Sequence, residues 1–532
     1  MYIKIMSVPD ILVPKTLERA VDVTVETNIL EPVSHQYSSE VGGVTRYVLP
    51  AKGVLDAPNC TINFEIVNGN ELVDGTDDKI MFPYWSGGLS CFDKITCRVG
   101  GQVLSTIQHA GMYATMKTGF KSIDYRSNVL DVRHSSSNMA EVRTVDHPTT
   151  AQTNFSNPVT VQGYSQVMNP TLDQSSIYGA MCGGNNNGTL HVPQTNKLLK
   201  KYSKRREGPE VSIRLADLFP YFESNMLPLL GMAQVELIFE WNPSVASSKL
   251  RNHASSYDNI VVPVAVDAAD DSVGYNATFA SPPFLSMDYL HYNDQERMKI
   301  MDEIGKGLTM NFREVVFTKG INQSNDAAEA VVTSNHLLGM AGKEVQNIYV
   351  LKDVKNTAII ANNPTYTRNP TLNKWKSQQS YDEAYNVFIN NQKIYNRDVS
   401  NPATQYNYLT QCDSKWHCMP TEYDTMNYNA NLKHVLLDTN QVGVVDNTAV
   451  KNGLSADRFP GSKHVIGIPL LKHPGLGNAP GNGERIGSAP IEFTYSNKKA
   501  TDRNPAITEL MFFIEHRRSM VITPLGVTVS DQ

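Results

Sequence analysis

The sequence predicts an all-β protein made of two tandem β domains joined by a short helix. Three observations support this fold class: apolar and polar residues alternate in many short runs, helical periodicity is scarce, and the second half of the chain repeats a hairpin of the first. Short strands with polar, Gly- and Asn-rich connections are typical of β-sandwiches and barrels. At roughly 100 to 200 residues per domain, the 532 residues suffice for two to four domains.

Composition indicates a folded and soluble chain. Hydrophobic residues make up 41% and charged residues 19%, and the formal net charge of −6 does not favour nucleic acid or an anionic membrane as an overall partner. Asp10 and two prolines interrupt the N-terminal segment where a signal peptide needs an apolar core, and no apolar run approaches the about 20 residues that span a bilayer. We therefore expect that the protein is not secreted by means of a signal peptide. The sparse cysteines, 6 in all, fit a reducing compartment.

The predicted strands follow from period-2 alternation. Residues 20–27 (AVDVTVET) and 60–66 (CTINFEI) alternate between apolar and polar side chains. The segment 92–107, FDKITCRVGGQVLSTI, predicts a tight hairpin because its Gly-Gly pair tolerates the positive φ of a two-residue turn. Further strands are predicted at 211–215, 234–241, 314–318, 347–351, 491–495 and 509–515.

One helix is predicted between the two halves. Asn293 is placed to cap the segment NDQERMKIMDEI, and Glu296 completes a pattern like a capping box, so the helix runs to near Gly305. A second helical segment, ADLFPYFESNMLPLLG, contains Pro220 and Pro228, which limit it to one or two turns.

The two halves show a weak internal duplication. The segment YNVFINNQKIYN places an Asn-Asn pair, 390–391, at the turn position that the Gly-Gly pair 100–101 occupies in the first hairpin. Aligning ELMFFIE with VELIFE also pairs Ile514 with Phe239. Any two antiparallel sandwiches share such alternation, so a true duplication and a chance likeness both stay open on the residues alone.

The predicted organisation has four parts and long connections. The limits are 1–40 for an N-terminal arm and first strand, 41–292 for the first β domain, 293–305 for the linking helix and 306–532 for the second β domain. Long irregular connections are predicted near 124–209, 242–283 and 397–462, and connections of this length are often functional surfaces.

No motif for catalysis or cofactor binding is found. The sequence contains no phosphate-binding loop, zinc-protease motif, nucleophile elbow or EF-hand loop, and its Gly-rich segment HPGLGNAPGNGERIG lacks the dinucleotide spacing. We therefore expect no enzyme, no catalytic residue and no cofactor.

The segment CDSKWHC holds the densest group of potential zinc ligands, Cys412, His417 and Cys418. The spacing between its cysteines is wider than in a zinc knuckle, and no second pair follows. We expect loop or partly buried cysteines here and no structural metal.

The densest positive charge lies in KLLKKYSKRRE. Its cations, six within ten residues, are Lys197, Lys200, Lys201, Lys204, Arg205 and Arg206. They have the charge to neutralise phosphates of nucleic acid, but a solvated loop or a contact with an acidic neighbouring subunit suits an acidic chain better. We treat them as a candidate assembly or anion-contact cluster.

Four segments carry a family resemblance. They are ETNILEPVS with RYVLPAKGVLD, the hairpin ITCRVGGQVL, the stretch VSIRLADLFPYFESNMLPLLGMAQVELIFEW, and FLSMDYLHYNDQERMKI. In this order they resemble the N-terminal arm and first strands, a hairpin of the first jelly roll, its late strand–helix–strand pattern, and its closing strand with the helix that follows. The family is that of the double jelly-roll major capsid proteins of the virophage, Polinton-like and large double-stranded DNA virus lineage.

The resemblance implies two tandem eight-stranded jelly rolls, a double jelly roll, with a short linking helix and long loop insertions. It implies a structural virion protein whose homotrimers have a six-fold outline and tile an icosahedral capsid around a double-stranded DNA genome. The implied partners are further copies of the chain, neighbouring trimers, penton and minor capsid or cement proteins, and weakly the genome. The protein would be made inside the host cell and located in the virion.

Two other classes of protein stay open. A carbohydrate-binding or cupin-like jelly roll needs clustered ligands or stacked aromatic rings, whereas the 13 His are dispersed and Trp is only 4. A minor virion or attachment protein would share the composition but needs repeats or a fibrous stalk, and the sequence shows neither.

Overall fold

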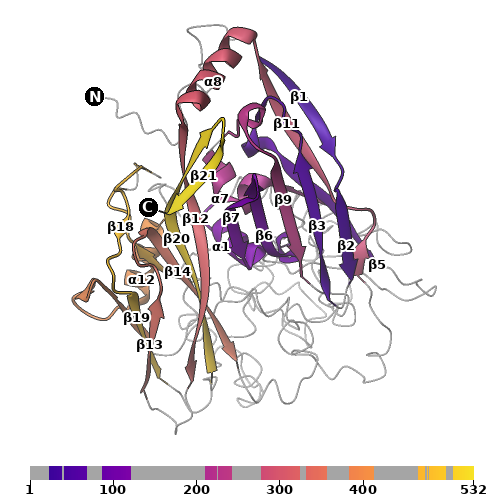
Figure 1. Cartoon of the computed structure of the whole chain (residues 1–532). Coiled ribbons are helices and arrows are strands. Elements are labelled where there is room, and N and C mark those ends of the chain that lie inside the picture. The colour runs from indigo at the N-terminus through magenta and orange to yellow at the C-terminus, as the bar shows by residue number, and fades with distance from the viewer. Residues whose placement is uncertain are drawn as a thin grey trace, which may run out of the picture.

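A computed structural model provides the fold. It describes residues 23–38, 41–68, 87–121, 210–224, 226–242, 277–323, 331–355, 383–412, 465–473, 476, 479–498 and 507–531. Two sandwiches of antiparallel sheets stand side by side, with the N-terminal one mostly in indigo to magenta and the C-terminal one in salmon, orange and yellow (Figure 1).

Two sheets face each other in the first half. One contains β1 (Val23–Leu30), β11 (Phe284–Tyr292), β5 (Thr61–Asn68) and β8 (Glu210–Arg214), with β4 (Val54–Leu55) and β10 (Ala277–Phe279) added. The other has the order β2 (Ser34–Ser38), β3 (Gly42–Leu49), β9 (Val235–Trp241), β6 (Phe92–Val99) and β7 (Gln102–Gln108).

The second half repeats this arrangement. One sheet has the order β12 (Leu308–Gln323), β20 (Ile507–Thr523), β14 (Glu344–Lys355) and β17 (Ile466–Pro469), with β18 (Glu484–Arg485) and β21 (Gly526–Asp531) added. The other has the order β13 (Val331–Leu338), β19 (Ile491–Lys498), β15 (Ala384–Ile389) and β16 (Gln392–Lys393).

Within the described residues, eight strands of each half follow one another in the same sequence order. These are β1, β3, β5, β6, β7, β8, β9 and β11 in the first half and β12, β13, β14, β15, β16, β17, β19 and β20 in the second. Exchanging each strand for its counterpart converts the sheet orders of one half into those of the other. The predicted double jelly roll is therefore confirmed, with each sandwich closed by pairing its first strand with its last.

The two predicted hairpins occupy equivalent places. Gly100 and Gly101 join β6 to β7 with φ of 55° and 83°, and Asn390 and Asn391 join β15 to β16 with φ of 50° and 62°. A two-residue turn with positive φ at both positions matches the twist of the strands that it joins, and Gly and Asn tolerate it best. The hairpin part of the predicted duplication is thus confirmed.

The predicted equivalence of Phe239 and Ile514 in the two halves is wrong. Phe239 lies in β9, between β3 and β6, whereas Ile514 lies in β20, between β12 and β14, and the counterpart of β9 is β19. Alternation of apolar and polar residues shows which face of a strand is buried, but it does not show which strand of the jelly roll a segment forms.

The linking helix α8 (Asp294–Lys306) begins as predicted. The Asn293 side chain accepts a hydrogen bond from the Glu296 amide at 2.9 Å, and the helix ends at Gly307, whose φ is 92°. The proline-containing segment forms the short turns α6 (Leu215–Leu218), α7 (Pro220–Ser224) and η7 (Leu229–Gly231). Two helices were not expected: α1 (Ala110–Thr118) follows β7, and α12 (Pro402–Gln411) follows β16. The remaining short turns are η2 (Ala57–Asn59) and η3 (Gly87–Cys91).

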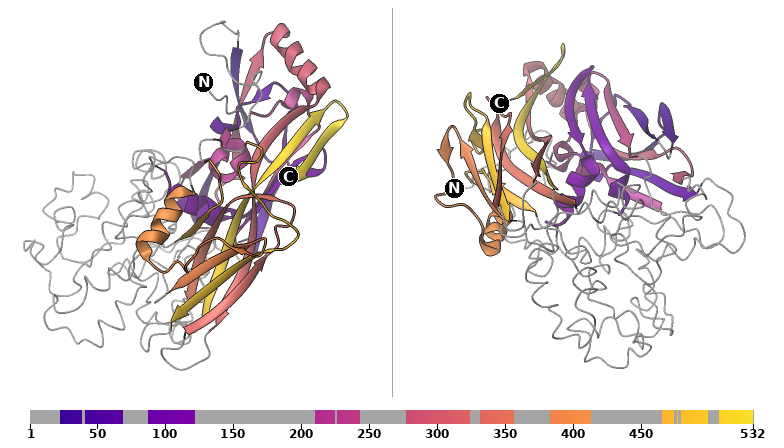
Figure 2. Two further views of the ribbon diagram at one scale, coloured as in Figure 1. Left: turned by 90° about the vertical axis from the view of Figure 1, so that its left-hand side faces the viewer. Right: turned by 90° about the horizontal axis from the view of Figure 1, so that it is seen from below.

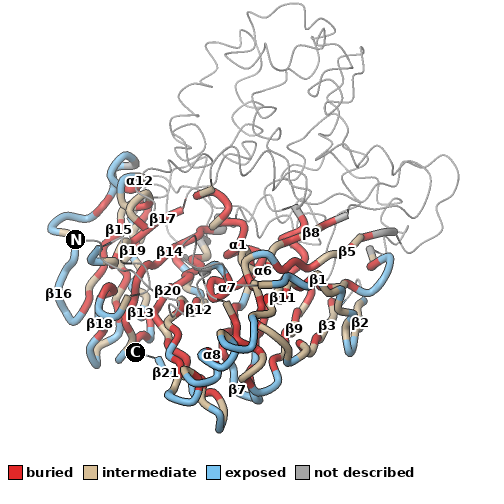
Figure 3. The backbone as a smooth tube through the Cα atoms, turned by 90° about the horizontal axis from the view of Figure 1, so that it is seen from above, coloured by how far each residue is buried: buried red, intermediate tan, exposed pale blue. Residues whose placement is uncertain are grey.

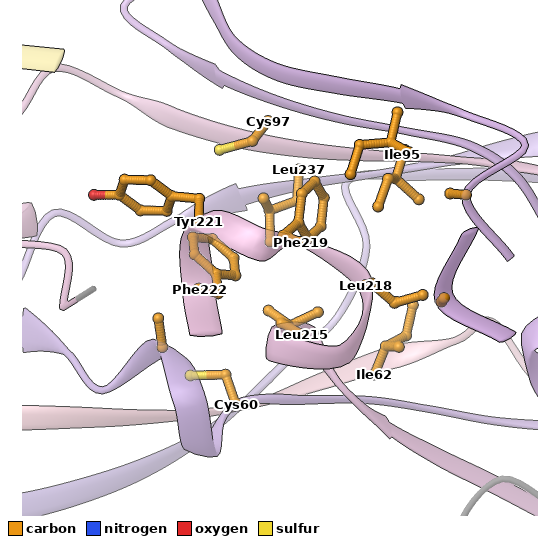
Figure 4. Close-up of a cluster of buried hydrophobic side chains, with 14 of the residues drawn as sticks. Cys60, Ile62, Ile95, Cys97, Leu215, Leu218, Phe219, Tyr221, Phe222 and Leu237 are labelled. Carbon is orange, nitrogen blue, oxygen red and sulfur yellow. The ribbon is translucent and has the colours of Figure 1, made fainter. Parts of the chain in front are cut away.

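The short turns α6 and α7 fill the interior of the first jelly roll. Leu215, Leu218 and Phe222 lie between the two sheets, among Ile62 and Leu237 (Figure 4). This core also includes side chains on the outer face of the β12–β20–β14 sheet, so buried residues run without a break from one jelly roll into the next (Figure 3).

Candidate functional site: the junction of the two jelly rolls

The basic cluster singled out in the sequence, Lys197 to Arg206, lies outside the described residues. Its role in assembly or anion contact stays a prediction.

The potential zinc ligands are only partly described. Cys412 follows α12 and is buried, with its Sγ donating to the Tyr408 carbonyl oxygen at 3.4 Å. His417 and Cys418 lie outside the described residues. In the described part of the chain, no three His, Cys, Asp or Glu side chains are grouped to hold a metal ion. None of the described helices is long and apolar enough to span a bilayer.

A buried polar cluster lies where α1 of the first jelly roll packs on the second. At its centre is Glu515 on β20, which is fully buried. Its carboxylate accepts hydrogen bonds from Tyr113 Oη at 2.5 Å and Asn347 Nδ2 at 2.8 Å. It also forms ion pairs with Lys117 Nζ and Arg313 Nη1, each at 3.4 Å. One buried carboxylate therefore joins α1 to three strands of the other jelly roll.

The charges in this cluster compensate for its burial. Burial alone would raise the pKa of Glu515, but Arg313 and Lys117, with hydrogen bonds from Asn347 and Tyr113, lower that pKa to about 2. The Glu515 carboxylate is therefore ionised across the physiological pH range. A buried pair of this kind is stable only while all its members remain, because a lone buried charge is costly.

A second polar contact lies at the edge of β7. The Thr106 amide donates to Glu314 Oε1 at 2.8 Å, and Arg518 Nη1 donates to the Leu104 carbonyl oxygen at 2.7 Å. Glu314 belongs to β12 and Arg518 to β20, so the second jelly roll satisfies backbone groups that an edge strand leaves open. Arg518 also donates through Nε to Asp531 Oδ1 at 2.8 Å.

Glu314 differs from Glu515 in its electrostatics. It is buried, and burial raises its pKa to about 7 although the Thr106 amide and Arg518 favour the charged form. Its Oε2 atom is buried and accepts no hydrogen bond in the described part of the molecule. The junction thus contains one carboxylate that stays charged and one that titrates near neutrality.

Aromatic rings fill the space between the polar contacts. His109 packs edge-on against Phe317, with ring centroids 4.5 Å apart, and Tyr113 lies 5.7 Å from Phe513. The junction therefore combines apolar packing with charged hydrogen bonds, and this fixes the angle between the jelly rolls.

Sequence reasoning did not single out the residues of the junction. The available signal was ELMFFIE: Leu510, Phe512 and Ile514 face the second core, whereas Met511 and Phe513 face the first jelly roll. An apolar run without alternation indicates a strand covered on both faces.

Comparison with known proteins gives structural relatives only. No family model and no curated protein sequence matches the chain. The PBCV-1 virus capsid is similar with a TM-score of 0.51 at 11% identity, over 97% of this chain and 98% of that chain. The Sputnik virophage structure is similar with a TM-score of 0.52 at 11% identity, over 97% of this chain and 90% of that chain. The expected resemblance to double jelly-roll capsid proteins is confirmed at the level of the fold.

Proposed function

We propose that the chain is a major capsid protein whose homotrimers tile an icosahedral shell around a double-stranded DNA genome. The observation that carries this proposal is the duplicated jelly roll, in the same strand order in both halves and similar to the PBCV-1 capsid over 97% of the chain. Two similar wedges per chain give a trimer six wedges, and a six-fold outline packs into a closed layer.

The junction supports the same function. Six equal wedges require a constant angle between the two jelly rolls of each chain. The ion pairs of Glu515 and the contacts of β7 with Glu314 and Arg518 supply such a rigid connection. The role is structural, and no step of it needs a catalytic group.

The proposal extends to partners and location. Copies of the chain associate first as trimers and then with neighbouring trimers in the virion. Penton and minor capsid or cement proteins bind at special positions, and the contact with the genome is weak.

The chain divides into an arm with first strand (1–40), a first domain (41–292), a linking helix (293–305) and a second domain (306–532). By this proposal the connections 124–209 and 242–283, most of whose residues lie outside the described part of the chain, form most of the trimer's outer surface. Limited proteolysis of particles should then cut there first. Cleavage confined to the first 40 residues would reverse that orientation.

Sedimentation and electron microscopy test the proposal. The purified protein should sediment near three times 59.0 kDa, and self-assembled material should show hexagonal trimers. A strict monomer at micromolar concentration would contradict it, and isolated monomers with bound glycan would favour the carbohydrate-binding alternative.

A further inference from the structure

We propose that the contact of β7 with β12 and β20 is a pH-sensitive clasp, which opens above neutral pH while α1 stays bound to Glu515. The clasp consists of the Thr106 amide with Glu314 and the Leu104 carbonyl with Arg518. Its opening would remove one of two attachments between the jelly rolls. The inference concerns the inside of a single chain and does not depend on the proposed function.

The first jelly roll holds β12 and β20 from both faces. In the register of these strands, Glu314 lies opposite His516. Glu515, one position before His516, lies opposite Val315. Because side chains alternate along a strand, Glu314 and Glu515 point to opposite faces, so β7 contacts one face and α1 contacts the other. Figure 2 (right) shows β12 and β20, in salmon and yellow, between the first jelly roll and the orange strands of the second. The two attachments are therefore separate contacts.

The Glu314 carboxylate is poorly compensated for its burial. The side chain is 5% exposed, and its Oε1 atom accepts one hydrogen bond, from the Thr106 amide at 2.8 Å. Its Oε2 atom is buried, and no hydrogen bond to it is found among the described residues. The Glu515 carboxylate, by contrast, has hydrogen bonds from Tyr113 and Asn347 in addition to its ion pairs. A buried carboxylate with so few donors is favoured in its neutral form.

The cation nearest to Glu314 is used elsewhere. Arg518 favours the charged form of Glu314, but its Nε donates to Asp531 at 2.8 Å and its Nη1 to the Leu104 carbonyl oxygen at 2.7 Å. Lys343 also pairs with Asp531, at 3.3 Å. These two cations therefore compensate for the charge of Asp531 on β21, and Glu314 keeps only the amide of Thr106 as a hydrogen-bond donor in the described part of the chain.

The other titratable groups around Glu314 keep one state between pH 5.5 and pH 8.5. Burial, together with Lys343, lowers the pKa of His516 to about 4, so this side chain is neutral. Burial raises the pKa of Cys97 on β6, and Glu314 adds to that shift, so the thiol is neutral too. Although burial opposes it, Arg518 and Lys343 lower the pKa of Asp531, which stays charged. A change at the clasp in this range therefore comes from Glu314, whose pKa burial raises to about 7.

The strand that the clasp holds is built to detach. Among the described strands, β7 pairs only with β6, so its other edge depends on the clasp. The register between β6 and β7 shifts between Cys97 and Arg98 and passes over Leu104. An irregularity of this kind disrupts the ladder locally. The edge of β7 can therefore move without the β6–β7 hairpin coming apart.

Detachment couples to pH in one direction. Once β7 moves away, water reaches the Glu314 carboxylate and its pKa returns toward 4.5, so ionisation favours the open state. The closed state is favoured below pH 4.5, and its advantage is lost as pH rises through 7. With these two pKa values, the open population rises about 30-fold between pH 5.5 and pH 8.5.

Hydrogen exchange at the Thr106 amide tests the clasp. Site-resolved exchange of the full chain is measured by mass spectrometry at pH 5.5 and pH 8.5, and each rate is corrected for the chemical exchange rate at that pH. The protection of the Thr106 amide should fall about 30-fold between the two conditions. The amides of α1 are the internal reference, and their protection should change less than about two-fold because Glu515, with a pKa of about 2, stays ionised.

Two variants assign the response to a side chain. Glu314→Gln keeps an acceptor for the Thr106 amide but cannot ionise, so the protection of this amide should be equal at both pH values. His109→Asn is the matched control, since it removes another titratable side chain of the junction, which packs on Phe317. Asn tolerates the φ of 50° at this position. This variant should keep the response of the wild type.

Each remaining outcome would overturn the inference. Constant or rising protection of Thr106 in the wild type would mean that ionised Glu314 holds β7 as firmly as the neutral form. A response that persists in Glu314→Gln, or disappears in His109→Asn, would assign the effect to another group. An equal loss of protection in α1 would mean that the whole junction opens. If Glu314→Gln fails to fold, the wild type and His109→Asn still decide. A monomeric wild type would contradict the proposed function and leave the clasp intact.

Discussion

Tyr113 on α1 donates its hydroxyl hydrogen to the Glu515 carboxylate on β20 at 2.5 Å, across a separation of 402 residues. This bond joins helix α1 of the first jelly roll to strand β20 of the second. The contact between the two domains therefore depends on side chains that lie far apart in the sequence.

Replacing Glu515 by Gln should destabilise the protein strongly. The change keeps the shape of the side chain but leaves Arg313 and Lys117 buried without their carboxylate, which costs about 3 to 5 kcal/mol. Urea denaturation at pH 7 measures the loss. The control is Glu240→Gln, since Glu240 pairs with Lys94 at a half-exposed site and should cost less than about 1 kcal/mol. Equal effects of the two substitutions would show that the junction does not depend on its charge.

Glu314 should make the protein less stable as pH rises. Burial raises its pKa from 4.5 to about 7, so the folded state holds a proton that the unfolded state releases. The stability from this group is fully present below pH 4.5 and is lost as pH rises through 7, a change of about 3 kcal/mol.

Glu314→Gln should remove most of this pH dependence while keeping the acceptor for the Thr106 amide. Denaturation at pH 5 and pH 8 checks it in both proteins. An unchanged slope in the variant would mean that another group is responsible.

The sequence predicted local structure better than it predicted the site. Alternation and turn residues located the hairpins at Gly100 and Asn390, and the cap at Asn293 located the linking helix. These features depend on neighbours in the chain. The junction depends on partners such as Tyr113 and Glu515, which come together only in three dimensions, and no local pattern marks them. The same limit explains why β9 was matched with β20 instead of β19.

A buried ion pair in the second jelly roll should behave as a unit. Lys352 and Glu383 form a salt bridge inside the sandwich, and Tyr495 Oη donates to the same carboxylate at 3.2 Å. Burial lowers the pKa of Lys352, although Glu383 opposes this shift. Lys352→Met alone should cost about 3 to 5 kcal/mol, because it leaves a buried carboxylate without its cation.

The double variant Lys352→Met with Glu383→Leu should recover more than half of that loss, since an apolar pair replaces the charges. Chemical denaturation of the two single variants and the double variant gives the coupling energy. Additive losses would show that the two side chains contribute separately.

The stability of the protein should depend on the shape of the side chain at the turn residue Asn391. Its φ of 62° is tolerated by Asn and Gly but disfavoured for β-branched residues. Asn391→Gly should leave stability unchanged or slightly higher, whereas Asn391→Val should lower it by about 1 to 2 kcal/mol. Thermal unfolding of both variants measures the difference. A neutral valine would indicate that the hairpin relaxes to another turn.

The cations of the basic cluster should contribute to assembly together, and mainly at low salt. Six cations within ten residues, from Lys197 to Arg206, repel one another unless anions surround them. In a chain of net charge −6, carboxylates of the same or a neighbouring subunit are the nearest abundant anions, and single exposed pairs are worth only about 0 to 1 kcal/mol. Replacing Lys204, Arg205 and Arg206 together by Ala should therefore weaken trimer or capsid assembly at low ionic strength and leave the fold intact, as light scattering and circular dichroism would show. Unchanged assembly with loss of packaged DNA would place the cluster against the genome instead, because phosphates would then be the anions that it neutralises.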